Sequence, residues 1–322
     1  MPLTDSPGYV APRWLRNPHF NSIYAAVFRK VPGVFYERER LLTPDDDFLD
    51  LDWSRTGSRR LLIACHGLEG SADRPYMRGM IRHFNRHGWD GLGINFRGCG
   101  GELNRKPYSY HMGWTTDLDF MVQKMATQGN YDEIALIGFS LGGNVVLNYL
   151  GRKGREVPQI VRKAVAFSVP CHIESANVEI NRRRNRLYLW RFMRSLNEKA
   201  RIKAAQFPGA FAFDPKNPPT SFYEFDEQVT APAHGFASNR DYWEKTSSLP
   251  VLDQICIPTL LVNAADDTFL SAQCYPVELA RKHPFFHFEK PRHGGHVGFV
   301  EFNNDGSFWS EKRALAFVQN NE

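Results

Sequence analysis

The 322-residue chain is predicted to fold as an α/β protein: a mostly parallel, doubly wound sheet with an inserted, mainly helical cap. Three observations support this prediction. Between about residues 60 and 168, short apolar runs alternate with segments of helical periodicity, which is the pattern of βαβ units with right-handed crossovers. Several of these runs open into glycine-rich loops. The alternation stops at about residue 170 and resumes at about residue 251, so an insertion is expected between two strands.

The residues before the first parallel strand are predicted to form an N-terminal arm and a hairpin at the edge of the sheet. Residues 1–34 are rich in proline and aromatic side chains, and we expect an irregular arm packed on the core, with a short helix near residues 22–28. Residues 35–42 and 47–53 alternate apolar with polar side chains. This alternation predicts an antiparallel hairpin at a sheet edge, with its turn around the aspartates that precede Phe48.

The remaining strands are short continuous apolar runs, as expected where helices cover both faces of a sheet. Strands are predicted at 60–65, 90–95, 133–137, 160–167, 257–263 and 285–289. Helices are predicted at 75–87, 114–127, 141–152, 271–282 and 307–319. The predicted organisation is therefore a core of residues 35–169 and 251–322, with residues 170–250 as the cap.

Composition narrows the class of protein. Hydrophobic residues make up 42% of the chain and charged residues 23%, which is ordinary for a globular protein. The net charge of +5 is too small to indicate a nucleic-acid partner. The five scattered cysteines form no C-x-x-C pair and suit a reducing compartment. The first residues lack the pattern of a signal peptide, and no apolar run reaches the length of a membrane span, so a cytoplasmic location is expected.

A serine stands where an apolar run meets a helical pattern, in Gly138-Phe-Ser-Leu-Gly142. This G-x-S-x-G arrangement is the nucleophile elbow of α/β-hydrolases, a tight turn that glycines make sterically possible. It predicts Ser140 as a nucleophile, with the Leu141 amide at a helix N-terminus where an oxyanion would form. The alternative is a glycine-rich turn in another kind of βαβ unit.

A serine nucleophile needs a base and an acid, and in this fold the acid precedes the histidine. Asp266 and Asp267 follow the strand at 257–263; the apolar Phe269, three positions on, favours Asp266, and the alternative role for either aspartate is a helix N-cap. His293 and His296 follow the last strand. Gly294-Gly295 allows a close backbone approach, which favours His296 as the base and leaves His293 in a supporting role.

The second oxyanion donor is expected in the loop after the strand at 60–65. The Leu68 amide follows His66-Gly67 and would pair with the Leu141 amide. We interpret His66 as a residue that orients this loop by hydrogen bonding. Asn95 and Arg97 are expected to hold loops together.

Other chemistry finds little support. The glycine loops match neither G-x-G-x-x-G nor a G-K-[ST] phosphate loop, and no metal-ligand spacing occurs, so neither a cofactor nor a metal is expected. Residues 182–203 carry nine arginines and lysines against one glutamate. The favoured interpretation is a solvated cap helix whose apolar side faces the substrate pocket. The alternative is contact with anionic lipid head groups or an acidic substrate, which would make the cap a peripheral membrane contact.

Together these motifs resemble the YheT-like branch of the α/β-hydrolase superfamily, which includes eukaryotic abhydrolase-domain lipases and plant embryogenesis-associated proteins. The resemblance runs along nearly the whole chain. Its motifs are Pro12-Arg-Trp-Leu-Arg-Asn-Pro-His19, Leu42-Thr-Pro-Asp-Asp-Asp-Phe-Leu-Asp-Leu-Asp-Trp53, His66-Gly-Leu-Glu-Gly-Ser71, Asn95-Phe-Arg-Gly-Cys-Gly-Gly101, Gly138-Phe-Ser-Leu-Gly-Gly-Asn144, Asn263-Ala-Ala-Asp-Asp267 and His293-Gly-Gly-His-Val-Gly-Phe299. It implies a triad of Ser140, Asp266 and His296, and carboxylic-ester substrates with medium or long acyl chains.

The sequence therefore predicts a metal-free serine hydrolase that cleaves small-molecule or lipid-like esters through an acyl-enzyme. The aromatic-rich cap would supply an apolar acyl pocket. Two alternatives stay open: an acyltransferase that uses an alcohol as acceptor, and a non-catalytic scaffold with the same fold. The sequence does not specify the natural ester or the oligomeric state.

Overall fold

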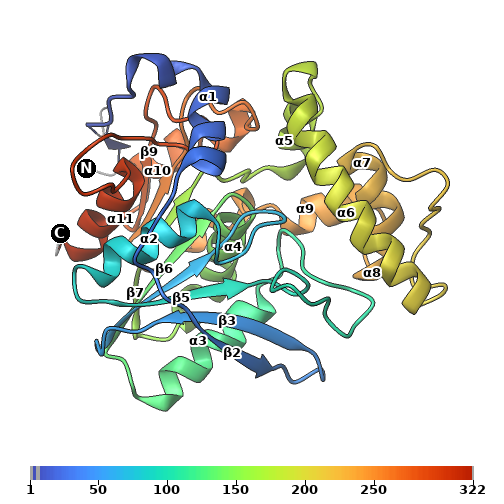
Figure 1. Cartoon of the computed structure of the whole chain (residues 1–322), viewed down its shortest axis with the longest axis horizontal. Helices are drawn as coiled ribbons and strands as arrows, with labels where there is room; N and C mark the ends of the chain where they lie inside the picture. Colours follow the sequence, from blue (N-terminus) through green and yellow to red (C-terminus); the bar gives the residue numbers. More distant parts are fainter. Residues whose placement is uncertain (1–2, 5–7, 321–322) are drawn as a thin grey trace.

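The computed structural model describes residues 3–4 and 8–320, and a nine-stranded sheet runs through them (Figure 1). The strand order is β1-β9-β8-β7-β6-β4-β5-β3-β2. The strands are β1 Leu3–Thr4, β2 Glu37–Leu42, β3 Phe48–Ser54, β4 Arg60–Cys65, β5 Asp90–Asn95, β6 Glu133–Phe139, β7 Val161–Phe167, β8 Thr259–Val262 and β9 Phe286–Glu289. All neighbouring pairs are parallel except β2–β3 and β3–β5. The predicted edge hairpin is therefore confirmed.

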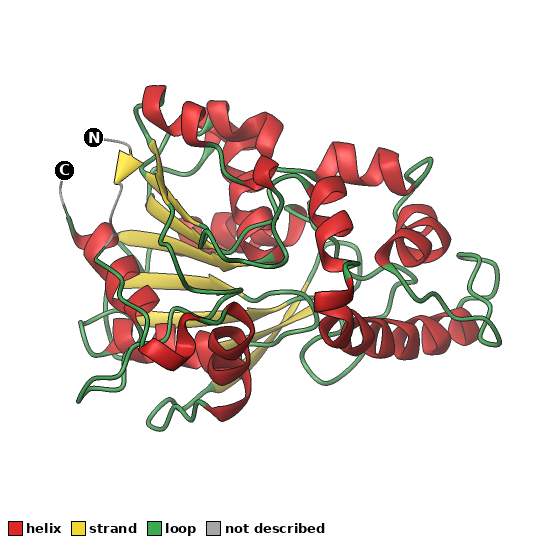
Figure 2. Cartoon of the chain, turned by 90° about the horizontal axis from the view of Figure 1, so that it is seen from above, coloured by secondary structure: helices red, strands yellow, loops and turns green. Residues whose placement is uncertain are grey.

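Helices cover both faces of the sheet, as Figure 2 shows from above. They are α2 Pro75–Asn85, α3 Thr116–Gln128, α4 Leu141–Lys153, α10 Val277–Lys282 and α11 Trp309–Gln319. On one face, side chains of α3, α4 and α10 pack with the strands in the larger buried cluster. On the other face, α2 and α11 do so. This two-sided burial explains why the parallel strands read as continuous apolar runs.

Residues 170–250, expected to form the cap, lie between β7 and β8. Their helices are α5 Ile173–Ile180, α6 Arg186–Gln206, α7 Phe222–Phe225, α8 Ala231–Ala233 and α9 Asn239–Thr246. Figure 1 places them beyond the carboxyl ends of the parallel strands. Apolar side chains of α6, α7 and the π-helical turn Asp226–Thr230 form a small core of their own. We use the name cap for this segment below.

Two predicted helices differ from the observed ones. The helix expected at 271–282 is a short 3₁₀ turn, Ala272–Cys274, followed by α10, because Pro276 precedes α10 and lacks the amide that would continue a helix. In the arm, helix α1 (Pro18–Ile23) begins earlier than expected, since the Asn17 side chain accepts hydrogen bonds from the His19 and Phe20 amides. A π-helical turn, Tyr24–Phe28, follows it.

Strand β3 is buried along its whole length, although its alternating pattern suggests one solvated face. Its two aspartates are buried because arginines on β2 neutralise them. Arg40 Nε lies 2.8 Å from the Asp50 carboxylate, and Arg38 Nε lies 2.7 Å from the Asp52 carboxylate. Paired charges can be buried where isolated ones cannot. Across the part of the chain that the structure describes, no helix is both long and apolar enough to cross a membrane.

Candidate active site

Ser140 stands at a sharp turn between β6 and α4. Its backbone has φ 53° and ψ −116°, a conformation that residues with a side chain rarely adopt. Glycines make room for the turn. A Cβ on Gly138 would lie 2.5 Å from the Gly142 carbonyl oxygen, and a Cβ on Gly142 would lie 2.4 Å from the Cys65 carbonyl oxygen. The turn therefore lifts Ser140 out of the sheet at the carboxyl end of β6.

The His296 imidazole lies between Ser140 and a buried carboxylate. Its Nε2 is 2.9 Å from Ser140 Oγ, and its Nδ1 is 2.9 Å from Asp267 Oδ2. A carboxylate only accepts, so the proton between His296 and Asp267 belongs on Nδ1. Nε2 is then free to accept the serine proton. The Phe269 ring stacks on the imidazole, with centroids 4.2 Å apart, and fixes its plane.

The structure contradicts the preference for Asp266 as the acid, because Asp267 is the aspartate beside His296 Nδ1. Asp266 instead faces His293, with 3.2 Å between Oδ2 and Nδ1, and its Oδ1 accepts a hydrogen bond from the Gly295 amide at 2.9 Å. Asp266 and Asp267 are neighbours in the turn after β8, but their side chains point to different sides. Each of them therefore contacts a different histidine. Asp266 supports the backbone of the histidine loop, and His293 takes part in that support.

The loop that should carry the second oxyanion donor lies against Ser140. A Cβ on Gly67 would be 3.3 Å from the Ser140 Cβ. Leu68, Leu141, Ser140 and His296 line the same pocket. Leu141 is the first residue of α4, so its amide has no acceptor within the helix. Among the described residues, the Leu68 amide also donates to no acceptor. The role of the two amides as oxyanion donors stays a prediction, which their shared pocket with Ser140 supports.

His66 supports the loop rather than acting at Ser140. Its Nε2 accepts a hydrogen bond from the Phe96 amide at 3.1 Å, which leaves Nδ1 to donate to the Gly67 carbonyl oxygen at 2.7 Å. Burial lowers the pKa of His66 to about 4, so the ring is neutral at pH 7. Arg97, also predicted to hold loops together, pairs with Asp117 at 2.7 Å.

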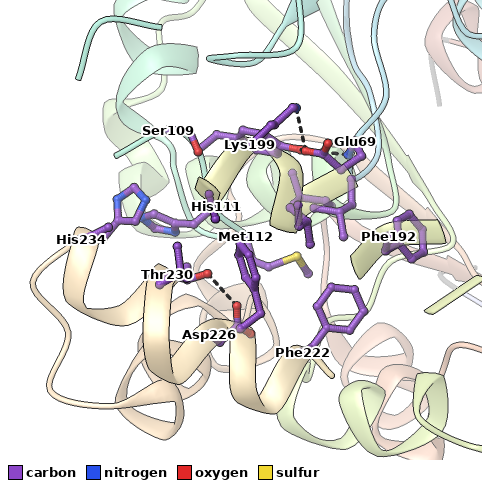
Figure 3. A pocket seen from close by; sticks show the side chains of 18 of the residues that line it. Glu69, Ser109, His111, Met112, Phe192, Lys199, Phe222, Asp226, Thr230 and His234 are labelled. Carbon is purple, nitrogen blue, oxygen red and sulfur yellow. Dashed lines mark hydrogen bonds and ion pairs between the residues drawn. The ribbon is translucent and has the colours of Figure 1, made fainter. Parts of the chain in front are cut away.

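A pocket extends from Ser140 and His296 between the core and the cap (Figure 3). Most of its wall is apolar. The cap contributes Ile173, Ile180, Phe192, Leu196, Phe211, Phe222, Phe225 and Val229, and the core loops contribute Leu68, Leu103, Pro107, Tyr110 and Met112. Polar and charged side chains also line the pocket, and Figure 3 shows two interacting pairs among them, Glu69–Lys199 and Asp226–Thr230.

Glu69 connects the cap to the loop after β4, which contains Leu68 and is called the oxyanion loop here. It follows Leu68 directly and has φ 53°. Its Oε1 accepts hydrogen bonds from Lys199 Nζ on α6 at 2.9 Å and from the Tyr110 hydroxyl at 3.0 Å. The Ser195 hydroxyl, also on α6, donates to Oε2. Because the Glu69 side chain is only 7% exposed, this connection is shielded from water and holds α6 over the oxyanion loop.

The cap end of the pocket contains a buried carboxyl group, Asp226, that forms no ion pair with any residue in the described part of the chain. Asp226 accepts hydrogen bonds from Trp243 Nε1 at 2.7 Å and from the Thr230 hydroxyl at 2.8 Å. Burial raises the pKa of Asp226 to about 6. Burial also lowers the pKa of His234, which lines the same pocket, to about 4. Within the described residues, no group of three or more histidine, cysteine, aspartate or glutamate side chains is placed to hold a metal ion.

The N-terminal arm reaches the histidine loop, a contact that sequence reasoning missed. The Ser22 hydroxyl on α1 accepts a hydrogen bond from the His296 amide at 2.8 Å and donates to the Pro18 carbonyl oxygen at 2.7 Å. The approach is so close that a Cβ on Gly295 would lie 2.4 Å from that same oxygen. A side chain 274 positions away holds the backbone of His296. The only signal in the sequence was the Gly294-Gly295 pair, and it did not identify the partner.

Comparisons with known proteins identify the family and the fold. The family described as alpha/beta hydrolase fold matches residues 60–302. The Escherichia coli (strain K12) protein named "Putative esterase YheT" is 32% identical, covering 92% of this chain and 88% of its own. Phospholipase ABHD3 of Mus musculus is 29% identical, covering 84% of this chain and 68% of its own.

Among solved structures, the esterase Pf2001 of Pyrococcus furiosus matches with a TM-score of 0.56 over 98% of each chain. At 19% identity this likeness concerns the fold alone. The family match and the similarity to YheT, by contrast, cover most of the chain in sequence. The chain belongs to the α/β-hydrolase family, and within it to the YheT-like branch that its motifs predicted.

Proposed function

We propose that this protein is a serine hydrolase that cleaves carboxylic esters through Ser140, His296 and Asp267. The observation that carries the proposal is the unbroken chain of contacts from Ser140 Oγ to His296 Nε2 and from Nδ1 to the Asp267 carboxylate, at 2.9 Å each. The names of its relatives, which include an esterase, a phospholipase and a monoacylglycerol lipase, support ester cleavage by this fold.

The proposed reaction has two halves. In the first, His296 Nε2 takes the Ser140 proton while Oγ attacks the ester carbonyl carbon, and the Leu68 and Leu141 amides stabilise the oxyanion. The imidazolium returns the proton to the leaving alcohol, which leaves an acyl-enzyme on Ser140. In the second half, His296 takes a proton from water, the hydroxide attacks the acyl carbonyl, and the carboxylic acid departs with Ser140 reprotonated.

The pocket supports an apolar acyl group of medium or long chain length. Its walls are mostly aliphatic and aromatic side chains of the cap and the core loops. Their burial against an alkyl chain stabilises a complex by about 0.8 kcal/mol per methylene group. Affinity for p-nitrophenyl esters should therefore increase from acetate toward longer chains until the pocket is full.

Labelling with a fluorophosphonate probe tests the mechanism most directly. The wild-type protein should label and the Ser140→Ala variant should not, and the same substitution should abolish hydrolysis of p-nitrophenyl esters. A folded wild-type protein that never labels, or equal labelling of both proteins, would reject Ser140 as the nucleophile. It would also favour the alternative of a non-catalytic scaffold.

An acyltransferase would share the first half of the reaction and differ in the second. Adding an alcohol during turnover separates the two activities, because a transferase forms a new ester where a hydrolase forms the free acid. Product analysis that finds ester exchange faster than hydrolysis would replace the hydrolase assignment with the transferase.

A further inference from the structure

One face of helix α6 exposes arginines and large apolar side chains to solvent. Residues three or four positions apart lie on the same side of a helix, and on this side every residue is exposed. Leu187 is 72% exposed and Trp190 is 61% exposed. We call this face the outer stripe of α6; it consists of Arg186, Leu187, Trp190, Arg191, Arg194, Glu198 and Arg201.

The opposite side of α6 forms part of the pocket wall. Phe192, Leu196 and Lys199 line the pocket, together with Ala200 and Lys203. The helix therefore has two distinct faces, one toward the candidate substrate site and one toward solvent.

The charges of the outer stripe are not used within the fold. Four arginines face one glutamate, and in the region that the structure describes none of the four forms an ion pair with a carboxylate. By contrast, Arg182 and Arg184, just before the helix, both pair with Glu179. The Arg194 guanidinium lies over the Trp190 ring, 5.7 Å from its centroid. This leaves unneutralised positive charge beside exposed apolar surface.

The start of the outer stripe lies close to the candidate catalytic residues. His19 Nδ1 on α1 is 3.3 Å from the Tyr188 hydroxyl, in the first turn of α6. The Tyr188 ring contacts Phe269 at 4.9 Å between centroids, and Phe269 stacks on His296. Phe20, the neighbour of His19, is 58% exposed. The contact between His19 and Tyr188 thus joins α1 to the start of α6 at the side of the molecule where His296 lies.

We propose that the outer stripe of α6 binds the surface of a membrane that contains anionic lipids. The arginines match the negative head groups, and tryptophan and leucine side chains beside them suit the boundary between head groups and acyl chains. A nucleic acid would use the arginines but would leave Leu187 without a role. Because binding is measured without turnover, the proposal stands or falls separately from the proposed ester hydrolysis.

Sedimentation with lipid vesicles tests the proposal. The Ser140→Ala variant serves as the starting protein, so that vesicle lipids are not consumed. It should bind vesicles with about one third phosphatidylglycerol at least ten times more tightly than vesicles of phosphatidylcholine alone, and the difference should shrink at about 0.5 M salt. Equal binding to the two compositions would overturn the proposal.

A matched pair of triple variants tests which surface is responsible. Arg186→Gln/Arg191→Gln/Arg194→Gln should lose at least about tenfold of the binding to phosphatidylglycerol vesicles. The control, Arg155→Gln/Arg162→Gln/Lys282→Gln, removes the same charge from exposed positions elsewhere and should bind as the starting protein does. Equal losses in the two triples would show a general charge effect and overturn the assignment to α6.

A third variant separates lipid from other polyanions. Trp190→Ala keeps all four arginines of the stripe and should still weaken vesicle binding by about threefold or more, because the ring no longer enters the interface. Unchanged vesicle binding in this variant, together with tight binding of duplex DNA that is lost in the Arg186 triple, would identify a nucleic-acid surface instead. Circular dichroism melting checks that every variant is folded.

Discussion

Replacing Asp267 with asparagine should nearly abolish turnover, whereas the same change at Asp266 should not. The Asp267 side chain is fully buried, and its oxygens lie 2.9 and 3.2 Å from His296 Nδ1. An asparagine amide there would donate toward Nδ1 and favour the tautomer whose proton sits on Nε2. In that tautomer His296 cannot accept the Ser140 proton.

The expected decrease in kcat follows from the two contributions of the Asp267 carboxylate that the substitution removes. Asp267→Asn removes both the correct tautomer and the charge that stabilises the imidazolium during the reaction. Together these effects should cost about 4–5 kcal/mol of transition-state stabilisation, which is a decrease in kcat of about 10³- to 10⁴-fold. Asp266→Asn keeps a carbonyl oxygen for the Gly295 amide at a side chain that is 18% exposed, so the loss should stay below about tenfold.

The assay is steady-state hydrolysis of a p-nitrophenyl ester, run beside the rate of fluorophosphonate labelling. Both rates should fall in Asp267→Asn and change little in Asp266→Asn. Melting curves of the two variants separate loss of folding from loss of catalysis. The reasoning would be refuted if a folded Asp266→Asn protein lost as much activity as Asp267→Asn, or more.

Three further outcomes are expected. Ser22→Ala should lower kcat about five- to tenfold with KM unchanged, because it frees the His296 amide; an altered KM alone would contradict this. In denaturant titrations, Lys199→Met and Glu69→Gln should show a coupling free energy of about 1–3 kcal/mol, and additive effects would contradict a stabilising ion pair between the two side chains. Asp226→Asn should raise the unfolding free energy at pH 8 by on the order of 3 kcal/mol. This gain should fade between about pH 6 and pH 4, where the folded carboxyl is already protonated; a gain that does not vary with pH would contradict its origin in burial.

The parallel strands were the part of the fold most accessible from sequence. The strands at 60–65 and 90–95 were predicted with their observed bounds. Two-sided burial favours short segments without polar alternation, bounded by turn residues, and this pattern is typical of buried parallel strands. The helix predicted at 271–282 was wrong in its middle, because apolar periodicity continues across Pro276 although the backbone cannot.

The candidate site was partly predictable for a similar reason. The elbow at Ser140 could be predicted from the local sequence, because the glycines around it leave the space that the tight turn needs. The choice between Asp266 and Asp267 depends on the direction of one side chain in an irregular turn, and no periodic pattern reports it. The contact of Ser22 with His296 joins residues 274 positions apart, so no local pattern could reveal it.

The arm that carries Ser22 has a practical consequence for work on this protein. The match to the family described as alpha/beta hydrolase fold begins at residue 60, after the arm and the edge hairpin. A shortened chain that starts there would keep Ser140, Asp267 and His296, yet it would lack the hydroxyl that holds the His296 backbone. Such a fragment could pass a test for the presence of the three residues and still be a poor enzyme. A domain boundary placed at the start of this family match would therefore remove the residue that holds the backbone of the candidate catalytic histidine.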